Sequence, residues 1–149
     1  MPGLQTLDVS NNALQGAAGA QALCTLLGAV PGLMHLDVSD NHICEEGAAV
    51  LAPVLRGMTC LQTLNLWDTS IGDGGSLAVA STLAALPCFH TLNLAKNWLG
   101  AQAMSALQPL WLKPGIPSCE LDSGGNRFDL NGAWGKPPRQ QPLLQHCSH

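Results

Sequence analysis

The chain repeats one short phrase at an almost constant spacing. The four copies begin at Leu4, Leu33, Leu61 and Phe89, so successive copies are 29, 28 and 28 residues apart. In each copy, apolar residues follow the first residue by three, five and ten positions, and an Asn or Thr follows it by eight. A fixed period of this size is typical of a solenoid, in which each unit buries its apolar face only against its neighbours. The period therefore predicts a stack of four similar units.

Each unit combines two kinds of apolar pattern. The phrase itself alternates apolar and polar residues, which predicts a short β-strand with its leucines facing inward. The segment after the phrase has helical spacing, as in Leu51 and Leu55, with the acidic Glu45 and Glu46 at its expected N-terminal end. Because a helix is wider than a strand, such units bend into a horseshoe. We therefore expect an α/β fold with a parallel sheet on the concave face and helices on the convex face.

The polar residue of each phrase is predicted to shape the turn after the strand. An Asn side chain both donates and accepts hydrogen bonds, so stacked Asn amides would satisfy buried backbone groups of neighbouring turns. Thr69 offers only a hydroxyl, and we expect a slightly looser turn there. The predicted ladder consists of Asn12, Asn41, Thr69, Asn97 and Asn126.

The C-terminal part departs from the pattern. A fifth copy is degenerate, because Ser118 and Ser123 stand where the other copies have apolar residues. Residues 1–130 are therefore predicted to form the repeat domain, with an incomplete fifth turn. Residues 131–149 are rich in Pro, Gln and Gly without periodicity, which is typical of a flexible tail.

Two further features concern the helices and the first strand. Pro53 and Pro109 fall at the same register of the second and fourth helical segments, and a mid-helix proline costs about 3 kcal/mol, so we expect kinked or short helices there. No polar unit covers the apolar residues of the first strand, which begins at Leu4. Uncovered solenoid ends favour aggregation. We hypothesise that the chain is a segment or short isoform of a longer repeat protein, or that a partner covers this end.

Composition excludes several classes of function. A net charge of −4 argues against a nucleic-acid-binding surface, which would be basic. No apolar run approaches the roughly 18 residues of a membrane span, and no secretory signal is visible. The six cysteines show no Cys-x-x-Cys motif, and we expect reduced, mostly buried thiols, including Cys60 and Cys88 at equivalent positions. These observations predict a cytoplasmic protein, with a nuclear location as the alternative.

The phrases LQTLDVSNNAL, LMHLDVSDNHI and FHTLNLAKNWL resemble leucine-rich repeats of the ribonuclease-inhibitor-like class. That class includes ribonuclease inhibitor, Ran GTPase-activating protein and the repeat regions of nucleotide-binding innate-immunity receptors. The resemblance covers about residues 3–128. It implies the horseshoe fold and binding of other proteins through the concave face and adjoining loops. Because members of the class share a scaffold and differ in partner, the resemblance does not indicate which protein is bound.

The repeat also sorts the polar residues into columns on the concave face. Trp67 occupies a column in which the other units carry Ser10, Ser39 and Ala95. An outward-facing Trp is a typical interface anchor, often worth 2 kcal/mol or more on truncation. The alternative is a surface Trp that fills space beside Ser39 and Ala95. Trp98 would extend the same patch along the loop edge.

Carboxylates crowd this face and predict a partner protein with a basic surface. Asp8 and Asp37 stand in the central outward column, where the alternative is that they only solvate the sheet. Asp40 and Asp68 stand in the loop column beside Trp67, where we favour binding. The complete set of predicted protein-binding residues is Trp67, Asp68, Asp40, Asp37, His35, Asn65, Asn93, Lys96 and Trp98.

No motif predicts catalysis, a cofactor or a metal site. Phosphate-binding glycine motifs do not occur, and no motif places a Ser or Cys nucleophile beside His35. We therefore expect a non-catalytic scaffold for protein–protein interaction. The alternatives are an inhibitor or activator of a partner enzyme such as a GTPase, and a fragment or isoform of a larger repeat-containing receptor.

Overall fold

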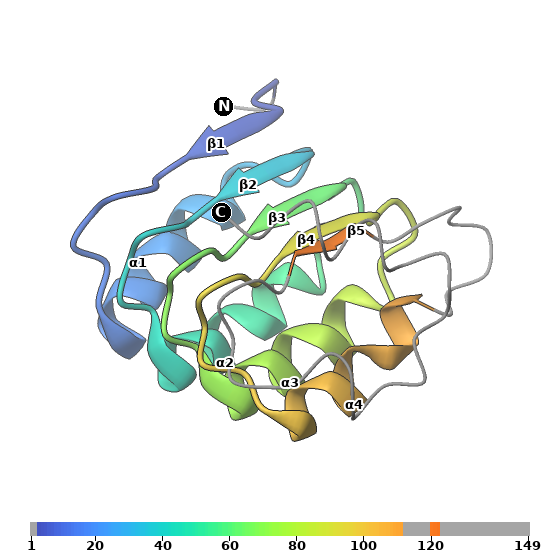
Figure 1. Cartoon of the computed structure of the whole chain (residues 1–149). Helices are drawn as coiled ribbons and strands as arrows, with labels where there is room; N and C mark the ends of the chain where they lie inside the picture. The colour runs from blue at the N-terminus through green and yellow to red at the C-terminus, as the bar shows by residue number, and fades with distance from the viewer. Residues whose placement is uncertain (1–2, 112–119, 123–149) are drawn as a thin grey trace.

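The computed structural model describes residues 3–111 and 120–122, and strands and helices alternate throughout them (Figure 1). The strands have three residues each, and each of the first four is followed by a helix of eleven to thirteen residues. The strands are β1 (Thr6–Asp8), β2 (His35–Asp37), β3 (Thr63–Asn65), β4 (Thr91–Asn93) and β5 (Glu120–Asp122). The helices are α1 (Gly16–Gly28), α2 (Cys44–Leu55), α3 (Gly72–Leu83) and α4 (Ala101–Trp111).

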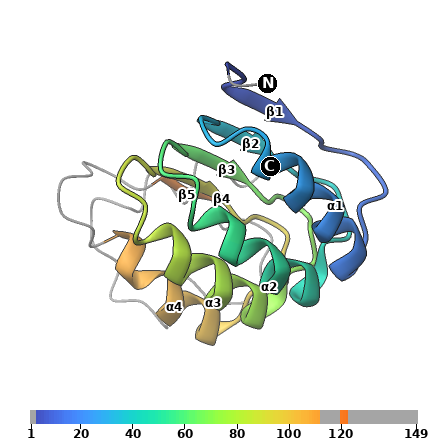
Figure 2. The same cartoon turned by 180° about the vertical axis from the view of Figure 1, so that it is seen from behind.

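The strands form one parallel sheet in the order β1-β2-β3-β4-β5, so each strand lies next to its neighbours in sequence. The helices form a second layer that covers one face of this sheet, as the two opposite views show (Figures 1 and 2). Thr6 pairs with His35, His35 with Thr63, and Thr63 with Thr91. These pairs follow the 29- and 28-residue shifts of the sequence. The predicted α/β repeat solenoid is therefore confirmed.

The core lies between the two layers and is aliphatic. The central leucines of three strands, Leu36, Leu64 and Leu92, are buried, while the residues on either side of them are half-buried. Helix residues four positions apart, such as Leu51 and Leu55, complete the core from the other side. Each fully buried Leu contributes about 1.5–3 kcal/mol relative to an exposed one. Stacking of identical positions therefore supplies the stability that a single unit lacks.

Three expectations need correction or qualification. Of the predicted kink or shortening, the shortening is wrong for α2, because α2 contains Pro53 and has the same 12 residues as the proline-free α3. α4 continues through Pro109 to Trp111, the last residue described before the gap. The expected burial of Cys60 and Cys88 is also wrong, because both thiols are exposed; Cys24 is buried and Cys44 half-buried. The degenerate fifth unit does contribute β5 to the sheet.

Other expectations fall on parts of the chain that the structure does not describe. Asn126, the domain boundary at residue 130 and the predicted tail all lie outside the described residues. Among the residues that are described, no helix is both long and apolar enough to cross a membrane.

Candidate protein-binding surface

The turn after each strand is held by side-chain amides. The Asn41 Oδ1 atom accepts hydrogen bonds from the backbone N–H groups of Asn12 and Leu14, at 3.1 and 3.2 Å. Its Nδ2 atom donates to the carbonyls of Val9 and Val38, at 3.0 and 2.9 Å. One Asn side chain thus joins two neighbouring units.

The Asn97 side chain repeats this arrangement toward the third unit. Its Oδ1 atom accepts from the N–H groups of Thr69 and Ile71, at 3.0 and 3.3 Å, and its Nδ2 atom donates to the carbonyl of Leu66 at 2.6 Å. Asn41 and Asn97 are both buried. Their capacity to donate and accept is therefore used where water is excluded.

Thr69 interrupts the series. Its hydroxyl donates to the carbonyl of Leu66, at 2.8 Å, and lies 3.0 Å from Asn97 Oδ1. The N–H groups of Asn41 and Ile43 correspond to those that bond an Asn Oδ1 in the units on either side. Within residues 3–111 and 120–122, the structure shows no acceptor for these two buried N–H groups.

The loop edge is the column of residues that directly precede the ladder positions. Asn11, Asp40, Asp68 and Lys96 all have left-handed φ angles, between 49° and 57°. Asn and Asp adopt this conformation more readily than most residues. The backbone N–H groups of the first three donate to carbonyls of the next unit, for example Asp40 to Trp67 at 2.9 Å. Asp40 and Lys96 are exposed and Asp68 is half-buried, so charged side chains line this edge.

Trp67 lies beside the loop edge and is half-buried. The Lys96 Nζ atom is 4.5 Å from the centroid of its ring, which is the geometry of a cation–π contact. The Trp67 backbone N–H donates to Asn65 Oδ1 at 3.1 Å. The indole is therefore held in place while part of it stays accessible.

The neighbours of Trp67 in its column do not face outward as predicted. Ser39 is 8% exposed and Ala95 is 2% exposed. The Ser39 hydroxyl bonds back to Asp37 Oδ1 at 2.6 Å, and an Ala side chain is too short to reach past the turn. Burial on both sides of Trp67 is consistent with the alternative that the indole also fills space over the adjoining units.

The polar residues of the sheet face largely bond to one another. Asp37 Oδ2 accepts from Asn65 Nδ2 at 2.9 Å, and His35 Nδ1 lies 3.0 Å from Thr63 Oγ1. Asn93 Oδ1 accepts from the N–H of Ala95 at 3.0 Å. A depression of about 250 Å³ lies over these strands and includes Asp8 and Asp37 in its lining. Hydrogen bonds from Ser10, first from its hydroxyl and then from its backbone N–H, lower the pKa of Asp8.

The predicted site residues thus fall into two groups. The structure places Asp40, Asp68, Trp67 and Lys96 together along the loop edge, and His35, Asp37, Asn65 and Asn93 on the adjoining sheet face. Trp98 follows Asn97 on the loop and is 63% exposed. The Lys96–Trp67 contact was not predicted. Lys96 is the loop-edge residue of the unit that follows the unit of Trp67. Leu77, 58% exposed on α3, was not predicted either.

The described residues offer no cluster of three or more His, Cys, Asp or Glu side chains that could hold a metal ion.

A family model of the leucine-rich repeat matches residues 3–24 and 33–52. The N-terminal region of the chain therefore consists of leucine-rich repeats, of the class typical of ribonuclease inhibitor and Ran GTPase-activating protein. The same strand-and-helix unit continues in register through β3, α3, β4 and α4. A search of curated proteins found no match.

Proposed function

We propose that this chain is a non-catalytic protein-interaction module whose partner docks on the loop edge and adjoining sheet face around Trp67. Leucine-rich repeats commonly serve as protein-binding scaffolds. The observation that carries the proposal is the position of Trp67: a half-buried indole, still partly accessible, stands where the neighbouring units carry Ser39 and Ala95. The register of the fold does not require an aromatic residue in that column.

The geometry of Trp67 suits an interface anchor. Lys96 packs over the ring, so the indole is already restrained before a partner arrives. An anchor that is held in place loses less side-chain entropy on binding than a freely rotating one. The exposed indole of Trp98 on the next turn adds apolar area to the same edge.

The charges around Trp67 favour a basic partner surface. Asp40 and Asp68 stand on neighbouring turns of the loop edge, and Lys96, the cation of that column, is engaged with the indole. Complementary charges raise association rates and select partners. We expect binding to weaken with added salt because the acidic side chains are partly solvent-exposed.

The test is affinity capture from a lysate of the source cells with three variants in parallel. Trp67→Ala should weaken capture by about 30-fold or more, since a hot-spot Trp contributes about 2 kcal/mol or more. Leu77→Ala removes an exposed apolar side chain from α3 on the helix layer and should leave capture unchanged. Asp68→Asn should reduce capture mainly at low salt. Equal capture by Trp67→Ala and the unmodified protein would refute the proposal.

A cytosolic or nuclear location accompanies this proposal. Cys60 and Cys88 are free and exposed, and such thiols persist in reducing compartments. Fractionation of cells that express the tagged chain would test the location.

A further inference from the structure

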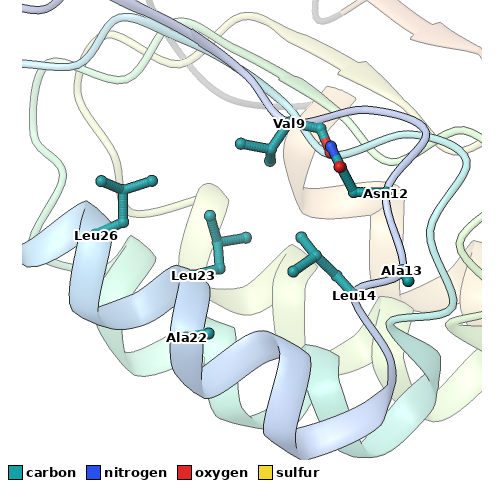
Figure 3. A pocket seen from close by; sticks show the side chains of 7 residues that line it. All are labelled: Val9, Asn12, Ala13, Leu14, Ala22, Leu23 and Leu26. Atoms are coloured by element: carbon teal, nitrogen blue, oxygen red, sulfur yellow. The ribbon is translucent and has the colours of Figure 1, made fainter.

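The N-terminal end of the solenoid carries an apolar groove of about 440 Å³ between α1 and the segment after β1. In Figure 3 the side chains of Val9, Leu14, Leu23 and Leu26 point into the space between the loop and the helix. Val9 and Leu14 are only half-buried. This groove lies at the end of the stack, away from Trp67, and the inference from it is independent of the proposed function.

The equivalent residues of the second unit show what would cover this face. Val38 and Ile43 correspond to Val9 and Leu14, and both are 0% exposed. They are buried because the first unit packs on them. The N-terminal end therefore presents the surface that, one unit further on, forms a repeat-to-repeat interface.

The backbone of β1 could also pair with another strand on its outer side. In the second unit, the N–H groups of Met34 and His35 both donate to the carbonyl of Gln5, at 2.8 and 2.9 Å. The corresponding N–H groups of Gln5 and Thr6 have no strand beside them within the described residues. A parallel strand on that side would complete the ladder.

The hydrogen bonds of the Asn12 side chain also indicate that another repeat unit fits this face. Asn41 and Asn97 each use Oδ1 to accept two N–H groups from the preceding unit. The Asn12 amide bonds only within its own turn, through Nδ2 to the carbonyls of Val9 and Ser10. Among the described residues, no group donates to its Oδ1 atom. An Asn in this position would accept from another leucine-rich-repeat turn.

The sequence ahead of β1 matches a connector between a helix and a strand. Residues 30–33 read Val-Pro-Gly-Leu and join α1 to β2, and residues 1–4 read Met-Pro-Gly-Leu. In the other connectors, Met58 and Leu86 hold the position of Val30, and all three are buried. Residues 1–4 therefore have the sequence of a segment that elsewhere follows a repeat helix.

From these four observations we infer that the N-terminal face is a stacking surface for one further leucine-rich-repeat turn. The turn's strand would pair in parallel with β1, and its helix would pack on α1. Its loop N–H groups would donate to Asn12 Oδ1.

One repeat unit of this chain can be used to test the inference. A second copy of residues 33–60 is placed directly ahead of Leu4 in the full chain, replacing residues 1–3. Cys60 is normally followed by Leu-Gln-Thr-Leu, and residues 4–7 are also Leu-Gln-Thr-Leu, so the new junction is native in sequence. The extended chain should unfold in one transition, with a midpoint at least about 5 °C above that of the unmodified chain.

Val9→Thr provides the matched control. In the unmodified chain Val9 is only half-buried, so we expect a hydroxyl there to remain hydrated and the midpoint to shift little. In the extended chain the same hydroxyl would be buried without a partner, so most of the gain should be lost. A gain that Val9→Thr leaves intact, or no gain at all, would overturn the inference. It would also be overturned by sedimentation showing that the unmodified chain dimerises while the extended chain does not, because a second copy would then occupy the face.

Discussion

At the residue scale, position 69 is the clearest departure from the repeat. Thr69 uses its hydroxyl within its own turn and toward Asn97, and it offers no carboxamide to the second unit. Two buried N–H groups, those of Asn41 and Ile43, consequently go without the acceptor that their counterparts have within the described part of the chain. A buried unsatisfied donor costs about 1–3 kcal/mol. The Thr at position 69, where the other units carry Asn, thus weakens the contact between the second and third units.

Thr69→Asn should therefore stabilise the protein. The new Oδ1 atom would accept from Asn41 and Ile43, and we expect the free energy of unfolding to rise by about 1–2 kcal/mol. Urea denaturation followed by circular dichroism measures the change. The reverse substitution, Asn41→Thr, removes the side-chain amide that accepts from the N–H groups of Asn12 and Leu14. It should therefore lower the free energy of unfolding. A destabilised Thr69→Asn protein would show that Thr69 is required for another reason.

Asp8 supplies a prediction about pH. Its pKa lies below the ordinary value of 3.8 because Ser10 donates to the carboxylate through its hydroxyl and its backbone N–H. A group whose folded pKa is lowered contributes stability above its unfolded pKa, and this contribution is lost as the pH falls through the folded value. In Ser10→Ala the hydroxyl bond is removed, and the pKa of Asp8 should rise toward 3.8. An NMR titration in which both proteins give the same value for Asp8 would contradict this.

At the scale of elements, the close approach of helices depends on glycine. A Cβ atom at position 47 would lie 2.8 Å from the carbonyl oxygen of Gly16 and from Ile43 Cγ2. At position 75 it would lie 2.8 Å from Ile71 Cβ and 3.0 Å from Ala48 Cβ. Both glycines are at the start of a helix that packs against the helix of the preceding unit. The spacing between α1, α2 and α3 therefore requires the absence of a side chain there.

Gly47→Ala should destabilise the protein although Ala favours helices by up to about 1 kcal/mol. The backbone carbonyl of Gly16 cannot move aside easily, and overpacking of this kind typically costs about 1–3 kcal/mol. A Cβ atom at Gly28, the last residue of α1, would meet no other atom within 4 Å, so Gly28→Ala should be neutral or slightly stabilising. The measurement is the midpoint of thermal unfolding, compared between the two variants. Similar midpoints for both would show that the helices can separate at no cost.

The sequence predicted residues within strands better than residues just outside them. His35, Thr63 and Thr91 lie in one column of the sheet, as their spacing indicated. The strands have only three residues, however, and the alternation of faces continues for one residue beyond them, to the buried Val38, Leu66 and Leu94. Beyond these residues the turn folds back onto the core, which explains why Ser39 and Ala95 are buried.

Cys60 and Cys88 illustrate the same limit. They occupy connectors between a helix and a strand, where neither the strand period nor the helix period applies. The side chains that follow them, Leu61 and Phe89, enter the core, whereas the cysteines remain exposed. A column of equivalent residues can be found from the period alone. Whether that column is buried depends on local backbone geometry that the period does not contain.

At the scale of the whole molecule, the two proposed surfaces are on different parts of the solenoid. Trp67, Asp68 and Lys96 lie along the loop edge of the middle units, and the groove around Leu14 lies at the N-terminal end. A repeat protein is held together by contacts between neighbouring units. Covering the end should therefore raise stability without altering the loop edge, and the two proposals can fail separately.

The most direct test of the proposed binding surface is oxidative footprinting of the purified complex with a captured partner. Docking at the loop edge predicts that Trp67 and Trp98 become protected from oxidation, while Leu77 on α3 keeps its free-state reactivity. Protection centred on Leu77, with unchanged oxidation of Trp67, would place the partner on the helix layer and contradict the account.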